Sequence, residues 1–195
     1  MPGGRPRAFD PEAALDRALE VFWRQGYEGT SLSDLTAAMD INRPSLYGAF
    51  GNKEQLFRAV LDRYFSSPGA FAAEALEAPT AREVVERLVL GAVELTTGPD
   101  TPCGCLSVNT VQACGPDSEP VRQEVIARRM AGEAALRRRF EQAADLPADC
   151  DPGVLAQLVH TVTDGIAVQA ASGRTRDQLH RVAALALRTL LRPPG

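Results

Sequence analysis

A short stretch near the N-terminus gathers side chains that suit contact with nucleic acid. Arg43 carries a guanidinium fork that can read guanine or hold a phosphate, and Tyr47 offers a hydroxyl at the reach of a backbone oxygen. Lys53, the only lysine in the chain, follows an expected helix N-cap, where a cation opposes the helix dipole. A bound phosphate would reverse that unfavourable interaction. The predicted DNA contacts are Thr30, Ser31, Arg43, Pro44, Ser45, Tyr47, Gly48 and Lys53.

Each of these residues also has an interpretation that requires no DNA. The Tyr47 ring could pack on the first helix, and Lys53 could be a solvated lysine that tolerates a small electrostatic cost. Thr30 and Ser31 stand at an expected helix start, where a hydroxyl caps backbone N–H groups whether or not it meets a phosphate. Gly48 costs about 1 kcal/mol relative to alanine inside a helix, which either a close approach of DNA or neutral drift explains.

Capping residues and apolar spacing predict the helices that position this stretch. One helix begins at Asp10 and ends at Gly26, and a second begins at Ser31. A polar turn at residues 40–42 leads into a third helix, and Asn52 caps a fourth. Two helices joined by a tight turn form a helix-turn-helix, which places its second helix in the DNA major groove.

The remainder of the chain keeps the helical period of apolar residues. The segment SSPG at residues 66–69 breaks that period, so we place a domain boundary there, with a DNA-binding domain at 1–66 and a second helical domain at 67–195. The sequence therefore predicts an all-α protein of about nine helices, a helix-turn-helix head followed by a helical domain. The five helices expected after the boundary cover residues 80–97, 105–113, 118–144, 154–171 and 176–191.

Composition restricts the classes of protein that remain. The net charge of −4 argues against a broad basic coat for nucleic acid, so any DNA binding must come from locally placed cations and helix N-termini. Arg5 and Arg7 form a basic arm that could reach a minor groove. No segment approaches the ~20 apolar residues that span a bilayer, and no apolar run follows the N-terminal arginines. We expect a cytoplasmic protein without membrane contact.

The four cysteines leave three interpretations open. Cys103, Cys105 and Cys114 could hold a soft metal such as Cu(I), or Zn(II) together with His160. They could instead sense oxidants or electrophiles, or pack as small buried side chains near a pocket. No complete ligand set is visible, so we favour packing, with reduced thiols and neither a metal site nor a cofactor.

Polar residues in the second half of the chain suggest a small-molecule pocket. His160 and Asp164 lie four residues apart on one face of an apolar helix, and Asn109 and Gln112 could supply further polar anchors. No nucleophile is tied to a histidine by sequence, so we predict no catalytic residues. The predicted pocket residues are Leu88, Cys105, Asn109, Gln112, His160 and Asp164.

The motif that runs from Leu46-Tyr47 through Phe50 to Lys53 and Leu56 resembles the N-terminal domain of the TetR family of transcriptional regulators, over residues 9–65. One departure is Asp40, at a turn position where that family usually has a small residue, often glycine. The resemblance implies a homodimer with a helical ligand-binding domain, whose last two helices build the dimer interface. The residues predicted for that interface are Leu155, Leu158, Val162, Ile166, Val182, Leu185 and Leu190.

Three hypotheses follow for the function. The first is a ligand-responsive regulator, most simply a repressor, which binds a palindromic double-stranded DNA operator as a homodimer and is released by a small-molecule effector. The second is a metal- or thiol-sensing regulator on the same scaffold. The third is a helical small-molecule carrier or enzyme without DNA contact, which the chain supports least because it lacks a nucleophile constellation, a phosphate loop and a cofactor motif.

Overall fold

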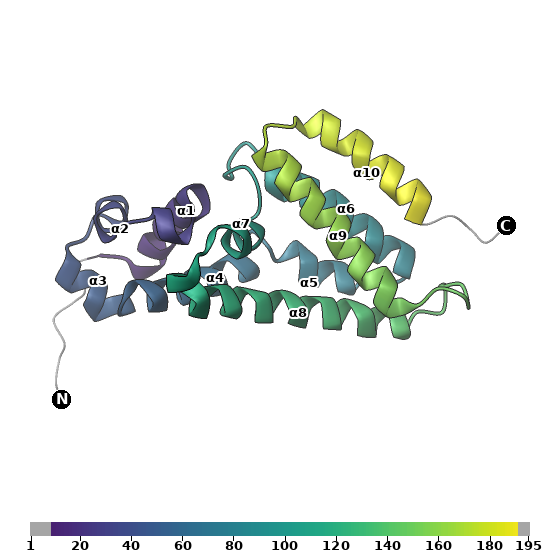
Figure 1. Cartoon of the computed structure of the whole chain (residues 1–195), viewed down its shortest axis with the longest axis horizontal. Helices are drawn as coiled ribbons and strands as arrows, with labels where there is room; N and C mark the ends of the chain where they lie inside the picture. The colour runs from purple at the N-terminus through teal and green to yellow at the C-terminus, as the bar shows by residue number, and fades with distance from the viewer. Residues whose placement is uncertain (1–8, 191–195) are drawn as a thin grey trace.

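A computed structural model describes residues 9–190, and this part of the chain holds ten α-helices, one 3₁₀ turn and no strand. The predicted all-α class is confirmed. Figure 1 shows α1–α3 at one end of the molecule and α9 and α10 towards the other. The helices are α1 (Pro11–Gly29), α2 (Leu32–Met39), α3 (Arg43–Phe50), α4 (Lys53–Ser66), α5 (Phe71–Leu76), α6 (Ala81–Thr97), α7 (Leu106–Ala113), α8 (Glu119–Glu141), α9 (Pro152–Ala171) and α10 (Arg176–Leu190), and the 3₁₀ turn η1 (Pro116–Ser118) precedes α8.

The first four helices form the head, residues 11–66, around a core of aromatic and branched side chains. Phe22 of α1 and Phe57 of α4 are fully buried and meet edge to face, with ring centroids 4.9 Å apart. Leu35 of α2 and Leu46 of α3 are buried in the same core. Because each helix buries one apolar face here, the opposite faces of α2 and α3 are left for solvent or a partner.

Capping side chains set the boundaries of α2, α3 and α4, and two of them, Ser31 and Asn52, were predicted. Ser31 and Asp34 form a reciprocal capping box, and Asn52 forms the same arrangement with Gln55. Asn42 accepts a hydrogen bond from the Ser45 backbone N–H at 2.9 Å and so starts α3. These caps fix where the third helix begins and how far it projects from the head.

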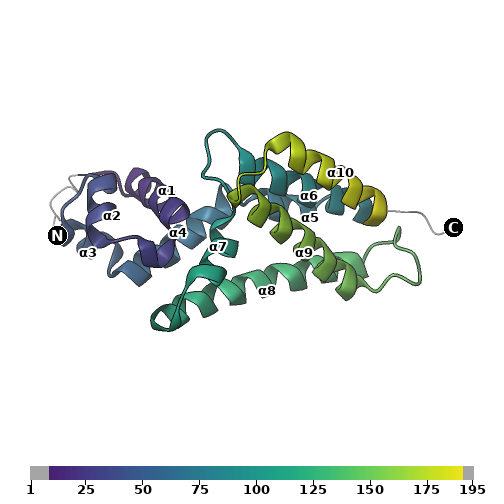
Figure 2. The same ribbon diagram turned by 45° about the horizontal axis from the view of Figure 1, so that its top comes forward.

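The second half of the molecule is organised around α6, which packs against α5, α9 and α10. Figure 2 shows α9 and α10 near α6, while α8 runs along one edge of the molecule. A second core forms among these helices, and its fully buried members include Val84, Val89 and Phe140. The core of the head and this second core are separate clusters of buried residues.

Three features differ from the sequence-based expectation. Gly26 was expected to end the first helix; it does leave helical geometry, with φ 74° and ψ 169°, but one more helical turn to Gly29 follows it. The six-residue helix α5 was not predicted, because one and a half turns are too short to show a period. The head's core also recruits Leu106, Val121 and Val125 from α7 and α8. The domain boundary after residue 66 coincides with the end of α4 and stays a prediction.

Among residues 9–190, no helix is both long and apolar enough to cross a membrane. The predicted arm at Arg5 and Arg7 lies outside the described residues.

Candidate functional site

The third helix presents one face outward at the end of the head. Leu46 is fully buried and anchors α3, whereas Arg43, Pro44 and Gly48 are exposed and the Tyr47 side chain is 49% exposed. A Cβ atom added to Gly48 would meet nothing within 4 Å. About half of the Tyr47 surface is therefore open to solvent, and no neighbour within the protein requires a glycine at residue 48.

Arg43 is oriented by the preceding helix. Its Nη2 donates a hydrogen bond to the Ser33 hydroxyl of α2 at 3.1 Å, between two exposed side chains. Sequence reasoning missed Ser33, because the pairing of residues ten positions apart depends on the angle between α2 and α3. The contact holds the guanidinium beside the exposed face of α3 and leaves other N–H groups of the fork free for a ligand.

The two hydroxyl residues at the start of α2 differ in their exposure. Ser31 is exposed, and its oxygen accepts from the Asp34 backbone N–H at 3.1 Å. Its side chain also hydrogen-bonds the Asp34 carboxylate and lowers the pKa of Asp34, so a phosphate would compete with Asp34 for the Ser31 proton. Thr30 is only 1% exposed and donates to the Gly26 carbonyl at 2.7 Å. This placement does not support the predicted contact of the Thr30 hydroxyl with DNA; its role is to close the kink after Gly26.

Lys53 lies at the first position of α4, next to α3. Its Nζ sits 4.5 Å from the centroid of the Tyr27 ring, in a cation–π arrangement. Partial burial lowers the pKa of Lys53, and the nearby Glu28 carboxylate opposes that shift. Tyr27 therefore holds the ammonium group in a defined place at the helix N-terminus, where backbone N–H groups also favour an anion.

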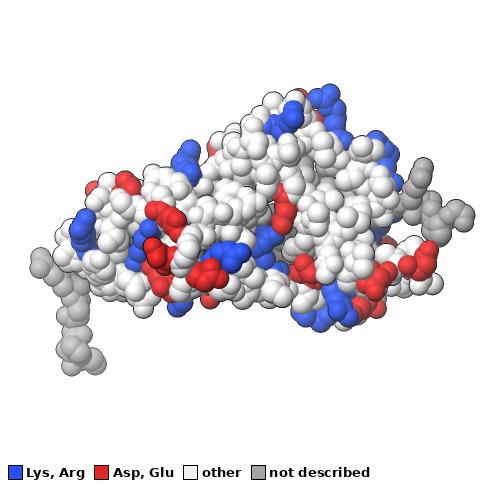
Figure 3. Space-filling model, viewed as in Figure 1, with Lys and Arg blue, Asp and Glu red and all other residues white. Residues whose placement is uncertain are grey.

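Charge on the face shown in Figure 3 is mixed rather than basic. Figure 3 shows lysine and arginine interspersed with aspartate and glutamate on the face it presents, with uncharged surface between them. Affinity for a polyanion would then depend on the few groups described above.

A chain of polar contacts crosses from the head into the second half of the molecule. The Tyr64 hydroxyl of α4 lies 3.1 Å from Cys105 Sγ, which lies 3.2 Å from the Ser107 hydroxyl. Arg129 of α8 donates to that hydroxyl at 3.3 Å and pairs with Asp164 of α9. We call this series, from Tyr64 to Asp164, the polar relay.

The six predicted pocket residues do not come together. His160 and Asp164 line a cavity of about 410 Å³ between α8 and α9. Leu88 instead packs in the second core, and Cys105 packs against the head's core. Gln112 is exposed and Asn109 lies near Gly104, so neither lines this cavity. The cavity that holds two of the six predicted residues lies between α8 and α9, and Arg129 and Glu133 are polar lining residues that the sequence did not reveal.

Burial and the neighbouring Arg129 charge lower the pKa of His160, against weaker opposing effects of Asp164 and Glu133. The imidazole is consequently neutral near pH 7 and can both donate and accept a hydrogen bond inside the cavity.

The cysteines are all free thiols, and among residues 9–190 no three His, Cys, Asp or Glu side chains gather as a metal site. Cys103 is exposed, whereas Cys105 sits in the polar relay. Burial and Glu28 raise the pKa of Cys114, which disfavours its reactive thiolate. The packing interpretation fits Cys114 and Cys105, which both pack against the head's core.

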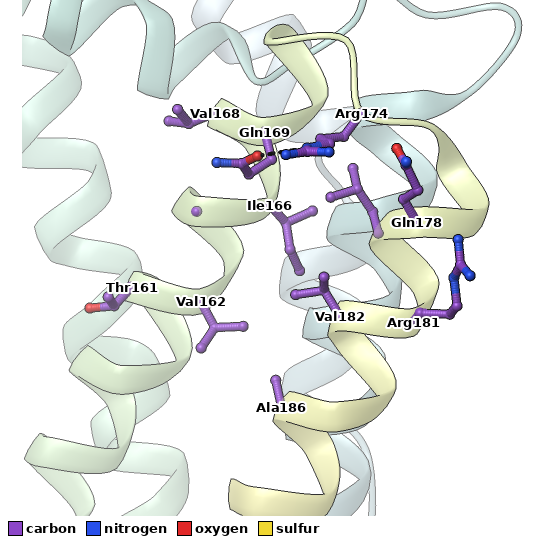
Figure 4. A pocket seen from close by; sticks show the side chains of 12 residues that line it. Thr161, Val162, Ile166, Val168, Gln169, Arg174, Gln178, Arg181, Val182 and Ala186 are labelled. Carbon is purple, nitrogen blue, oxygen red and sulfur yellow. Dashed lines mark hydrogen bonds between the residues drawn. The ribbon is translucent and has the colours of Figure 1, made fainter.

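An apolar surface covers α9 and α10. Val154, Leu158, Val182 and Leu185 are 62%, 42%, 54% and 59% exposed. Between the two helices lies a groove of about 840 Å³, and Figure 4 shows Val162 and Ile166 of α9 across from Val182 and Ala186 of α10. Among the predicted interface residues, Leu155 is buried in the chain's own core, Ile166 is buried there but also lines the groove, and Val162 and Leu190 are partly buried against the core.

Comparison with known proteins assigns this architecture. The family model described as "Bacterial regulatory proteins, tetR family" matches residues 14–60. The chain is 34% identical to the HTH-type transcriptional repressor ComR of Escherichia coli (strain K12) over 190 residues, which cover 95% of this chain and 90% of that one. It is 30% identical to the HTH-type transcriptional repressor BdcR of the same organism, over 94% of this chain and 90% of that one.

Among solved structures, the chain is similar to a cysteine variant of the TetR family transcriptional regulator CifR, which was determined in complex with a 26-base-pair double-stranded operator DNA. The two share 44% sequence identity with a TM-score of 0.89, and the match covers 94% of this chain and 98% of that one. The head with its exposed third helix and the full-length relatives lead to one conclusion: this chain belongs to the TetR family of bacterial transcriptional regulators.

Proposed function

We propose that the protein is a transcriptional repressor of the bacterial cytoplasm that binds a palindromic operator as a homodimer and leaves it when a small-molecule effector binds the second half of the chain. The observation that carries the proposal is the exposed face of α3, with Arg43 held by Ser33 and Lys53 held by Tyr27 beside it. The full-length similarity to a regulator solved on operator DNA supports the same reading.

Pairing of two copies would set the distance between the two DNA-binding heads. The exposed apolar residues of α9 and α10 suit a second copy of the chain, because a symmetric partner brings the same apolar surface to the same groove. Two heads held by one dimer would then meet half-sites about 34–36 Å apart. An effector that binds the DNA-incompetent spacing more tightly would shift the population away from the operator.

Tyr47→Phe and Lys53→Ala test the proposed contacts. Each removes one charged or phosphate-directed hydrogen bond, so we expect about tenfold weaker binding to an operator that the wild-type protein has selected from a random DNA library. Lys53→Ala should also lower the slope of log affinity against log salt concentration by about 1. Fluorescence anisotropy with labelled operator measures both effects.

Arg137→Ala is the matched control, because Arg137 is an exposed arginine near the end of α8, paired with Glu141 and adjacent in sequence to Leu136 of the second core. It should leave operator affinity unchanged. Unchanged affinity in both head variants, with helical circular dichroism intact, would remove this assignment of DNA contacts.

A second candidate function is thiol-based sensing, and one observation favours it. The Cys105 sulfur lies between Tyr64 of the head and Ser107 of α7, so oxidation of this thiol would alter a contact between the two halves of the chain. Hydrogen peroxide should then weaken operator binding by the wild-type protein and not by Cys105→Ser. An equal response of the two proteins would argue against this candidate.

A further inference from the structure

The cavity between α8 and α9 combines charges of both signs within one small volume. Its lining is Ile126, Arg129, Met130 and Glu133 from α8 with Gln157, His160, Thr161 and Asp164 from α9. Its volume of about 410 Å³ lies at the small end of the range for ligand sites. A compact polar molecule fits this description better than a large apolar one.

Arg129 and Glu133 give the cavity a cationic and an anionic end. They lie four residues apart on α8, which corresponds to about 6 Å along a helix axis. Arg129 pairs with Asp164 rather than with Glu133, and no ion pair of Glu133 occurs among residues 9–190. The Glu133 carboxylate is thus left to interact with solvent or a ligand.

The guanidinium keeps capacity for a ligand despite its two protein contacts. An arginine has five N–H groups, of which one from each terminal nitrogen is used by Ser107 and Asp164. A ligand carboxylate can therefore approach Arg129 without breaking the polar relay. The neutral His160 imidazole and the Gln157 amide offer hydrogen bonds to either end of such a ligand.

We propose that this cavity binds a small zwitterion, a molecule with a carboxylate that pairs with Arg129 and an ammonium group that pairs with Glu133. The inference rests on the proposed function, since it names the class of the effector. Asp164 already compensates Arg129, so a ligand with only a negative charge would face the uncompensated Glu133 carboxylate. A ligand with only a positive charge would pair with Glu133 but would leave the remaining N–H groups of Arg129 without an acceptor.

Isothermal titration calorimetry on the full-length protein without DNA tests the proposal. The probes are the standard L-amino acids and γ-aminobutyrate, each at millimolar concentration, with butyrate and butylamine as analogues that carry one charge only. We expect at least one zwitterion to bind and neither single-charge analogue to match it. Loss of one charged contact in Glu133→Gln should weaken that binding about tenfold or more.

Two further variants make the result specific. Arg129→Lys keeps the charge but loses the planar fork, and we expect it to weaken binding as well. Glu141→Gln makes the same change as Glu133→Gln on the same helix, outside the cavity, and should bind like the wild type. Because Glu133 has no ion pair within the described residues, Glu133→Gln should fold normally, which circular dichroism checks.

The proposal is overturned if no probe binds, if butyrate or butylamine binds as tightly as the zwitterions, or if Glu133→Gln binds with unchanged affinity. Operator binding is measured separately, so the two proposals can fail independently. A protein that binds its operator but none of the probes keeps the proposed function and loses the zwitterion. A protein that binds a zwitterion but no DNA keeps the cavity and loses the proposed function.

Discussion

At the turn between α2 and α3, Asp40 adopts the left-handed conformation, with φ 55° and ψ 46°. A Cβ atom makes that conformation unfavourable, although aspartate tolerates it better than most residues. Asp40 is also exposed and adds a negative charge near the predicted DNA face. The backbone conformation of Asp40 thus lowers the stability of the turn, and its charge disfavours the approach of DNA.

Asp40→Gly should raise the free energy of unfolding by about 0.5–1 kcal/mol, because glycine adopts the left-handed region without a Cβ penalty. Thermal unfolding should shift upward by about 1–4 °C for a chain of this size. Asp40→Ala removes the same charge but keeps the Cβ, so it should lower stability instead. A shift of both variants in the same direction would mean that the charge, and not the backbone, determines the effect.

His160 links the stability of the protein to pH. Its folded-state pKa lies below the ordinary value of 6.5, so the unfolded chain takes up the proton more readily. The stability that depends on the neutral imidazole is complete above about pH 6.5 and is lost as the pH falls through and below that value. Carboxylates with lowered pKa, such as Asp145 and Asp151, lose their contribution only at lower pH.

Urea unfolding between about pH 7.5 and 5 measures this dependence. The free energy of unfolding of the wild type should fall over that range more steeply than that of His160→Gln, which cannot take up the proton. Arg129, Asp164 and Glu133, the charged groups that act on His160, are present in both proteins, so the titration of the imidazole itself distinguishes the two slopes. Parallel curves for the two proteins would contradict the predicted linkage.

Among the helices, sequence predicted boundaries better than faces. Ser31 and Asn52 mark helix starts through their own side chains, and such local signals are readable without tertiary structure. Leu155 was assigned to the wrong face because α9 is apolar on more than one side, and only its packing on α6 decides which side is covered. The predicted pocket residues lie apart for the same reason, since the sequence does not reveal which residues of α7 face α8.

The polar relay connects helices that are far apart in the sequence. A double-mutant cycle tests whether its first contact, between Tyr64 and Cys105, contributes to the free energy of unfolding. Tyr64→Phe and Cys105→Ala each remove one partner of the 3.1 Å contact between α4 and the start of α7. We expect the two changes to be non-additive by about 0.5–1 kcal/mol in the free energy of unfolding.

Trp23 supplies an independent signal for the same contact. It is the only tryptophan, it meets the Tyr64 ring at 4.9 Å, and its indole N–H donates to the Gly104 carbonyl at 3.0 Å. Its emission should change in both single variants. Tyr64→Phe combined with Thr96→Val should be additive, because the Thr96 hydroxyl donates to the Ala92 carbonyl and the Tyr64 hydroxyl contacts Cys105. Additivity in the first pair as well would show that the relay carries no coupling at this step.

For the molecule as a whole, α8 is the element that joins the two cores. Val121 and Val125 near its start belong to the head's core, whereas Leu136 and Phe140 near its end belong to the second core. The proposed effector cavity uses the intervening residues Ile126 to Glu133. A ligand there would contact a helix that contributes buried residues to both cores, so a shift of α8 would change its packing against the head.

The proposed function requires that two copies of the whole molecule pair through α9 and α10. Leu185 is 59% exposed on α10, and a glutamate there would place a charge inside the predicted interface without disturbing the chain's own core. Leu185→Glu should therefore elute at the chain mass of 20.9 kDa in light scattering, where the wild type should elute at twice that mass. A single head keeps its contacts but loses the gain from linked half-sites, so operator affinity should fall by about 100-fold or more.

Leu90→Glu changes an exposed leucine of α6 outside the α9–α10 groove and should leave both mass and affinity unchanged. A complex that contains one 20.9 kDa chain per operator would rule out the dimer and with it the palindromic site.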